Sequence, residues 1–172
     1  GILFGDGLGN FASPKTLSTG YDSVPYSLAI SELNNDDTLD IIVVNHGANN
    51  VGIFLGQGNG AFEIQVIIST GYKSQPYSVA VDDLNNDIYM DIVVACSDLN
   101  TIEVLLGFGD GSFTIPYKYS TDNNSFPLSL VLGDFDNDNH VDIAVANYQN
   151  ESVGVFFGYG NGFFTDQMIF FS

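Results

Sequence analysis

Three acidic segments place oxygen-bearing side chains at alternating positions, which is how one short loop can surround a metal ion. The segments are residues 32–40, 83–91 and 134–142, each nine residues long. In every one, an oxygen side chain stands at positions 1, 3, 5 and 9. Ca²⁺ takes about six to eight oxygen ligands from carboxylates, amides, backbone carbonyls and water. The loops therefore predict calcium sites, with the backbone carbonyl of position 7 as a further ligand.

The predicted ligands occupy the same five positions of each loop, and up to three Ca²⁺ are expected. They are Asp134, Asp136, Asp138, His140 and Asp142 in the third loop; Asp83, Asn85, Asp87, Tyr89 and Asp91 in the second; and Glu32, Asn34, Asp36, Thr38 and Asp40 in the first. Mg²⁺ fits such a loop less well because it demands near-ideal octahedral geometry and keeps its waters. Zn²⁺ prefers Cys and His, which are not clustered here.

The charge balance of the chain supports a cation. There are 21 acidic residues against 3 basic ones, and the net charge is −18. Twelve of the acids lie in the segments 32–40, 82–91 and 134–142, where like charges destabilise a fold unless a cation neutralises them. No basic patch exists to bind nucleic acid or anionic lipid. The same side chains also form Asx turns without a metal, an alternative that spacing alone leaves open.

The elements that position the loops belong to an internal repeat. A glycine-rich hairpin begins at Leu3 and recurs at Phe54, Leu105 and Phe156, always 51 residues further on. In the second complete unit, Tyr77–Asp82 alternates between polar and apolar residues as a half-buried strand does, and Asp91–Ser97 is continuously apolar as a strand covered on both faces is. Two further strands are predicted at Ile102–Gly107 and Phe113–Tyr119.

No segment has helical spacing, so the sequence predicts an all-β protein. Four short antiparallel strands per unit and a fixed 51-residue repeat are typical of β-propeller blades. We expect one domain over 1–172, made of an N-terminal hairpin of a partial blade (1–20) and three full blades (21–71, 72–122 and 123–172).

The hairpin motif and the acidic loop together resemble the FG-GAP repeat family, also called VCBS-type, over nearly the whole chain. This family forms the propeller of integrin alpha chains and of some lectins, and it binds calcium through nine-residue loops. The resemblance implies calcium at positions 1, 3, 5, 7 and 9. Family loops often have Gly at position 6, where this chain has Asp37, Ile88 and Asn139. Ile tolerates left-handed geometry poorly, and Glu32 is longer than Asp, so the sites rank third, second, first.

The remaining residues favour a non-enzymatic protein. His46 and His140 are isolated, Cys96 lies in an apolar run typical of a buried side chain, and no nucleophile, zinc-protease or phosphate-loop motif occurs. The leading function is a calcium-stabilised adhesion or recognition scaffold. The alternatives are a propeller lectin, in which the hairpin-tip residues Phe108 and Tyr159 stack on sugars, and an accessory domain of a larger secreted enzyme.

Partners and location follow from the same features. The ligand, protein or glycan, is not identified, and no apolar run is long enough to insert in a membrane. Calcium loops and the sequons at Asn123 and Asn150 favour an extracellular or secreted setting. The chain begins within the repeat pattern at Gly1, and three blades with a hairpin leave open edges. Either the chain is part of a longer propeller, or copies assemble into a homo-oligomer that closes the ring.

Overall fold

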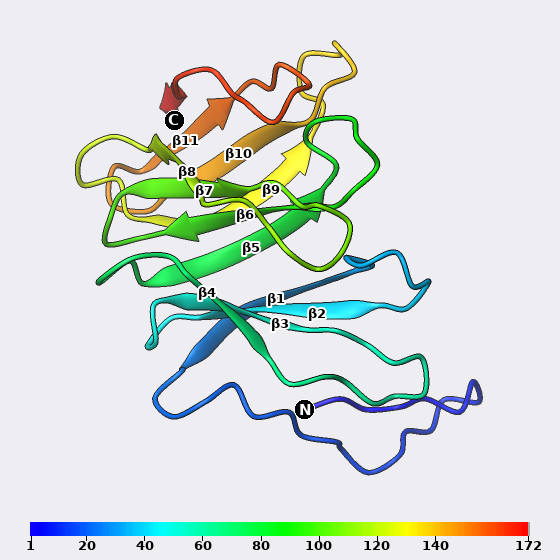
Figure 1. The fold of residues 1–172 in the computed structure, drawn as a ribbon. Coiled ribbons are helices and arrows are strands. Elements are labelled where there is room, and N and C mark those ends of the chain that lie inside the picture. The colour runs from blue at the N-terminus through cyan, green and yellow to red at the C-terminus, as the bar shows by residue number, and fades with distance from the viewer. Residues whose placement is uncertain (172) are drawn as a thin grey trace.

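The computed structural model describes residues 1–171, and all regular secondary structure in them is β. Twelve strands form three four-stranded antiparallel sheets, each with its strands in chain order (Figure 1). The first contains β1 (Pro25–Ser31), β2 (Asp40–Asn45), β3 (Asn50–Phe54) and β4 (Val66–Ser69). The second contains β5 (Pro76–Asp82), β6 (Asp91–Cys96), β7 (Thr101–Leu105) and β8 (Tyr117–Ser120). The third contains β9 (Pro127–Gly133), β10 (Asp142–Asn147), β11 (Ser152–Phe156) and β12 (Met168–Phe171). The all-β prediction is confirmed, and one sheet lies within each predicted unit.

The second strands of the first two sheets, β2 and β6, are covered on both faces, as their apolar sequences predict, whereas β10 leaves Ala146 exposed at the end of the stack. All residues of β6 are buried, including the free Cys96, and burial raises the pKa of its thiol well above the ordinary value. The predicted fourth strand of this sheet begins later than expected, at Tyr117. Phe113 instead makes an isolated bridge with Gly107, because the chain there closes the glycine hairpin before it joins the sheet.

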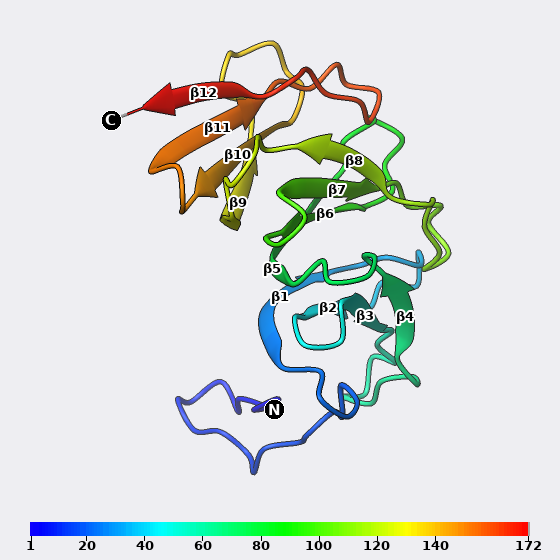
Figure 2. The ribbon, with the colours of Figure 1, turned by 90° about the vertical axis from the view of Figure 1, so that its left-hand side faces the viewer.

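The sheets pack face to face in chain order, joined by two apolar clusters. The first cluster joins β1–β4 to β5–β8 through side chains such as Ile42, Val44 and Val94. The second joins β5–β8 to β9–β12 through side chains such as Val93, Ile143 and Phe156. Each fully buried side chain of this size contributes about 1.5–3 kcal/mol, so these two junctions hold the sheets together. Figure 2 shows that the stack is open: the N-terminal segment lies at one end and β12 at the other.

Residues 1–20 repeat the outer half of a sheet. Ile2 bridges Lys15, and Gly5 bridges Phe11 in the pattern that Gly56 and Phe62 repeat. The Lys15 ammonium donates to the carbonyl of Gly60 at 2.7 Å, which ties the segment to the first sheet. The predicted N-terminal hairpin is therefore present, without the two inner strands of a full sheet. Among residues 1–171 no helix is long and apolar enough to cross a membrane.

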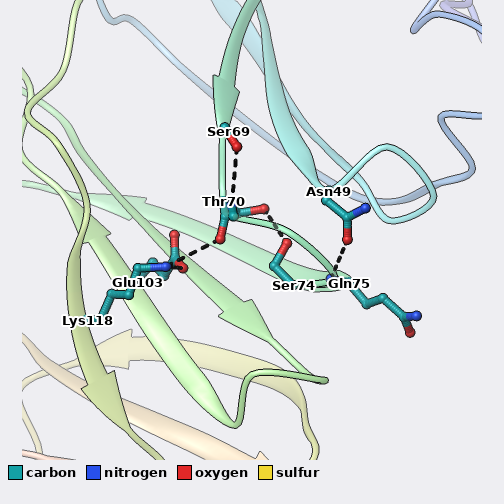
Figure 3. Close-up of polar contacts among 8 residues, drawn as sticks. Asn49, Ser69, Thr70, Ser74, Gln75, Glu103 and Lys118 are labelled. Carbon is teal, nitrogen blue, oxygen red and sulfur yellow. Dashed lines mark hydrogen bonds and ion pairs between the residues drawn. The ribbon is translucent and has the colours of Figure 1, made fainter.

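The middle sheet departs from its neighbours at one buried charge. Glu103 on β7 is fully buried, and the corresponding residues of the other sheets are Gly52 and Gly154, each covered by a glutamine side chain. One carboxylate oxygen of Glu103 accepts from the Lys118 ammonium at 2.5 Å. Lys118 also donates to the carbonyl of Thr70, at the link between the first two sheets (Figure 3). Burial raises the pKa of Glu103, which the hydrogen bond and charge of Lys118 partly oppose.

Replacing Lys118 by isoleucine, the residue at the corresponding positions 67 and 169, is expected to destabilise the protein. Breaking a buried pair leaves an uncompensated charge, and we expect a loss of about 3 kcal/mol, since Lys118 is itself half exposed. Urea unfolding measures the loss. Lys73→Leu is the control, because Lys73 lies over the Tyr72 ring at the surface and pairs with no buried acid, and leucine puts no β-branched residue at its φ of 57°. Glu103→Gln in the Lys118→Ile background should recover most of the loss; equal stability of Lys118→Ile and wild type would refute this role for the pair.

Candidate metal centre

The last aspartate of each acidic loop is buried and joins the loop to the glycine hairpin. Asp40, Asp91 and Asp142 are fully buried at the first position of β2, β6 and β10. In the second loop, one oxygen of Asp91 accepts from the Leu84 amide at 2.9 Å and the other from the Gly107 amide at 2.7 Å. The other two loops make the same pair of bonds, at 2.7–2.8 Å. A carboxylate, with acceptors on both oxygens, is the side chain that satisfies both amides.

The third loop gathers three carboxylates at one point. Ligand atoms of Asp134, Asp136 and Asp138 all lie within 4.8 Å of one another, and the three side chains are exposed. The loop holds them through its own amides: the Asp138 amide donates to both Asp134 and Asp136 at 3.2 Å, and the Asn139 amide donates to Asp134 at 3.0 Å. Three carboxylates this close present the hard oxygen donors that Ca²⁺ prefers.

The first and second loops make similar backbone hydrogen bonds but carry one acid fewer at the predicted ligand positions. Asp83 accepts from the amides of Asp87 and Ile88, as Asp134 does in the third loop. Amides stand at position 3, where Asn34 and Asn85 donate to the aspartate at position 5. The Oδ1 atom of Asn34 is buried and has no hydrogen-bond partner, so its lone pairs are available to coordinate a cation. Among residues 1–171, only the third loop brings three acidic ligands together.

The residues at position 7 direct their amides at the loop, and in the first loop the Thr38 hydroxyl also donates to the Asp36 carbonyl, at 3.5 Å. The amides of Thr38, Tyr89 and His140 donate to the aspartate at position 5, at 2.8–2.9 Å. The rings of Tyr89 and His140 instead lie over Gly109 and Gly160 of the following hairpin, leaving no space for a side chain there. Their prediction as backbone ligands is compatible with this packing and is untested by it.

In the part of the chain that the structure describes, no cationic side chain pairs with a loop acid. The single ion pair among the described residues is the one between Lys118 and Glu103. Partial desolvation, and then the charges of the other three loop aspartates, raise the pKa of Asp136. Burial raises the pKa of Asp40 and that of Asp91, the latter to about 6, against the opposing effect of their amide bonds. The metal-free loops are therefore regions of uncompensated negative charge.

Each loop makes two left-handed turns. Positions 4 and 6 have positive φ throughout, with Asn at position 4 and the predicted Asp37, Ile88 and Asn139 at position 6. Asn and Asp adopt this region at modest cost, whereas a β-branched residue there is strained. Ile88, at φ 74° and 77% exposed, has this strain without compensating burial.

The first two loops also bind the following sheet, a task that was not predicted from the sequence. The side chain of Asn35 donates to the carbonyl of Gly109, and that of Asn86 to the carbonyl of Gly160. The amides of Gly111 and Gly162 donate in return to the carbonyls at position 2 of the loops, at 2.9 and 3.0 Å. The signal was present, because Asn stands at position 4 in all three loops.

A model of the FG-GAP-like repeat matches residues 32–94 and 83–145, together about two thirds of the chain. The chain belongs to the FG-GAP-like repeat family. Each match begins at the first residue of an acidic loop and runs into the second strand of the following sheet. The family assignment from sequence is thus confirmed. Among curated proteins, none matches this FG-GAP-like chain.

Solved structures share the fold of this FG-GAP-like protein at low identity. A streptogramin B lyase structure superposes with a TM-score of 0.55 at 20% identity. Two structures of virginiamycin B lyase from Staphylococcus aureus, one an inactive variant with quinupristin, superpose with a TM-score of 0.56 at 18% identity. The alignments cover 90% of this chain and 57–58% of those chains. At such identity the likeness shows the fold alone, that of a β-propeller-like repeat protein.

Ile88→Asn is expected to stabilise the metal-free protein by about 1 kcal/mol, because it removes left-handed strain from a β-branched residue. Asn139 occupies the corresponding position with φ 69°, so the backbone accepts this substitution. Chemical denaturation measures the gain. Ile115→Asn is the control, as Ile115 is 88% exposed and lies outside the left-handed positions. Equal changes in both variants would mean that Ile88 carries no strain.

In the presence of a chelator, the free energy of unfolding should rise as pH falls from about 6 to about 4. The pKa of Asp91 is raised from 3.8 in the folded protein, so the folded state binds its proton more tightly than the unfolded chain does. The resulting stabilisation is complete below the ordinary pKa and is lost as pH rises through about 6. Urea unfolding across this range measures the slope, and Asp91→Asn should reduce it. A slope of the opposite sign would show that ionised Asp91 stabilises the metal-free fold.

Proposed function

We propose that this protein is a calcium-binding β-propeller repeat scaffold whose acidic loops hold Ca²⁺ and that serves in adhesion or recognition. The observation that carries the proposal is the convergence of Asp134, Asp136 and Asp138 within 4.8 Å, with no cationic partner among residues 1–171. Ca²⁺ supplies the missing positive charge and accepts several carboxylate and carbonyl oxygens at about 2.3–2.6 Å. Up to three ions are proposed, with the third loop as the tightest site.

The scaffold role rests on where the loops lie. Each stands between the first two strands of a sheet, is fixed by a buried aspartate, and in the first two sheets contacts the following hairpin. An ion in the loop stiffens both the connection between the first two strands of the sheet and the contact with the following sheet. The acids recur in every unit, as a structural ion requires, so we propose a non-enzymatic role. An extracellular setting is part of the proposal, because free Ca²⁺ there fills sites of about 10⁻⁴–10⁻³ M affinity.

Glycan binding is the second candidate. Phe108 and Tyr159, at the hairpin tips, are 57% and 58% exposed. The hairpins lie at the same end of the sheets as the acidic loops, because Gly107 and Gly158 bond Asp91 and Asp142. Exposed aromatic rings beside ion sites offer stacking surfaces for sugar rings, and a glycan array run with and without calcium tests this candidate.

Calcium is expected to bind with measurable heat and to raise the melting temperature of the chelator-treated protein. An ion that binds only the folded state stabilises it by about 2.7 kcal/mol per site at 100 times the dissociation constant. Titration calorimetry and melting curves measure both effects. Asp136→Asn should weaken the tightest site, while Asp166→Asn, an exposed aspartate outside the loops, should not. No heat and an unchanged melting temperature at saturating calcium would refute the calcium proposal.

A further inference from the structure

The two ends of the stack expose apolar side chains whose counterparts elsewhere in the chain are buried. At the C-terminal end the exposed residues are Val131 (57%), Phe135 (47%), Val153 (47%) and Phe170 (51%), which we call the tail face. The residues 51 positions earlier are Ala80, Leu84, Ile102 and Tyr119, and all four belong to the cluster that packs against the third sheet. Leu84 and Ile102 are 2% and 0% exposed. The tail face is thus the surface that a following sheet covers in the rest of the molecule.

The N-terminal end has the complementary surface. We call residues 1–20 the head segment; within it, Leu3 is 54% exposed and Phe11 is 68% exposed. Their counterparts in the third sheet, Phe156 and Phe164, are 1% and 6% exposed, because they pack against the preceding sheet. The head segment therefore presents the side chains that a sheet uses to contact the one before it.

The two ends of the stack also carry the donor and acceptor groups that form hydrogen bonds at the internal junctions. Inside the stack, a position-2 carbonyl accepts from the last glycine of the next hairpin, and a position-4 asparagine donates to its middle glycine. On the tail face these groups are the Phe135 carbonyl and the Asn137 side chain. On the head segment they are the Gly9 amide and the Gly7 carbonyl. None of these four groups makes the corresponding junction bond among residues 1–171.

We propose that the tail face of one copy binds the head segment of a second copy, head to tail. The contact continues the two sheet junctions already present and pairs Phe135 and Asn137 with Gly9 and Gly7 of the partner copy. Residues 1–20 correspond to the third and fourth strands of a sheet, so the contact covers the part of the tail face beside β11 and β12. The part beside Val131, on β9, faces the position of the first two strands, which residues 1–20 do not supply. Because the contact is heterologous, two copies form two such junctions if the arc closes into a ring. The proposal does not depend on calcium.

Sedimentation velocity of the full chain, from micromolar to submillimolar concentration, tests the proposal. We expect a concentration-dependent increase in mass from one chain to two. Val153→Lys on the tail face and Phe11→Lys on the head segment should each weaken association at least about tenfold, since either places an unpaired ammonium in an apolar contact. Both residues are already exposed, so the variants should melt like wild type. Ile115→Lys is the control, an exposed position outside both surfaces where the third sheet has Asp166.

Mixing the two disrupting variants decides the geometry. Each keeps one intact surface, so the mixture should regain a single junction and form a heterodimer, while each variant alone stays monomeric. A wild-type mass of one chain at every concentration, with and without calcium, would overturn the proposal. Association that Phe11→Lys leaves unchanged would also overturn it, since the contact would then not use the head segment.

Discussion

The buried carboxylate at the end of each acidic loop is the interaction on which the rest of the structure depends. Asp40, Asp91 and Asp142 each accept two backbone amides, one at the start of the loop and one at the start of the glycine hairpin. These bonds bring sequence positions 16 residues apart to the same end of a sheet. At neutral pH Asp91 is ionised while it is buried, although burial raises its pKa to about 6. A cation in the same loop resolves this conflict by balancing the charge where it stands.

The same loops link one sheet to the next. Each therefore connects two strands within its own sheet and, in the first two sheets, also contacts the following sheet. The position-4 asparagine and the position-2 carbonyl reach the following hairpin, and the apolar faces close beside them. Stability in such an array is approximately a sum of unit terms and nearest-neighbour interface terms. A metal that stiffens a loop then acts on both terms. The third loop, which brings three carboxylates together, contacts no further sheet among residues 1–171, and its carboxylates are exposed.

Much of the fold follows from the sequence, because the same order of apolar strands and glycine turns recurs every 51 residues. The four strands per sheet, the burial of Cys96 and the left-handed position 6 of each loop were all predictable from residue types. The start of β8 was not, because Phe113 has the composition of a strand residue while the hairpin closes on it. The pairing of Glu103 with Lys118 was also missed, since it breaks the repeat and depends on where two separate strands bring their side chains.

The candidate site was predictable in part. Alternating oxygen side chains indicated the loops, and the structure brings Asp134, Asp136 and Asp138 together as the spacing predicts. The bond of the last aspartate to the hairpin could not be foreseen, because it depends on an amide 16 residues further along the chain. The left-handed strain at Ile88 became measurable only with the backbone angle in hand.

The most direct measurement of the central claim is the number of calcium ions that one folded chain retains, counted by native mass spectrometry after exchange into calcium-containing volatile buffer. The account predicts at least one ion per chain, up to three as calcium increases, with the first lost when Asp136 is replaced by asparagine. A folded chain that retains no calcium at any concentration would contradict it.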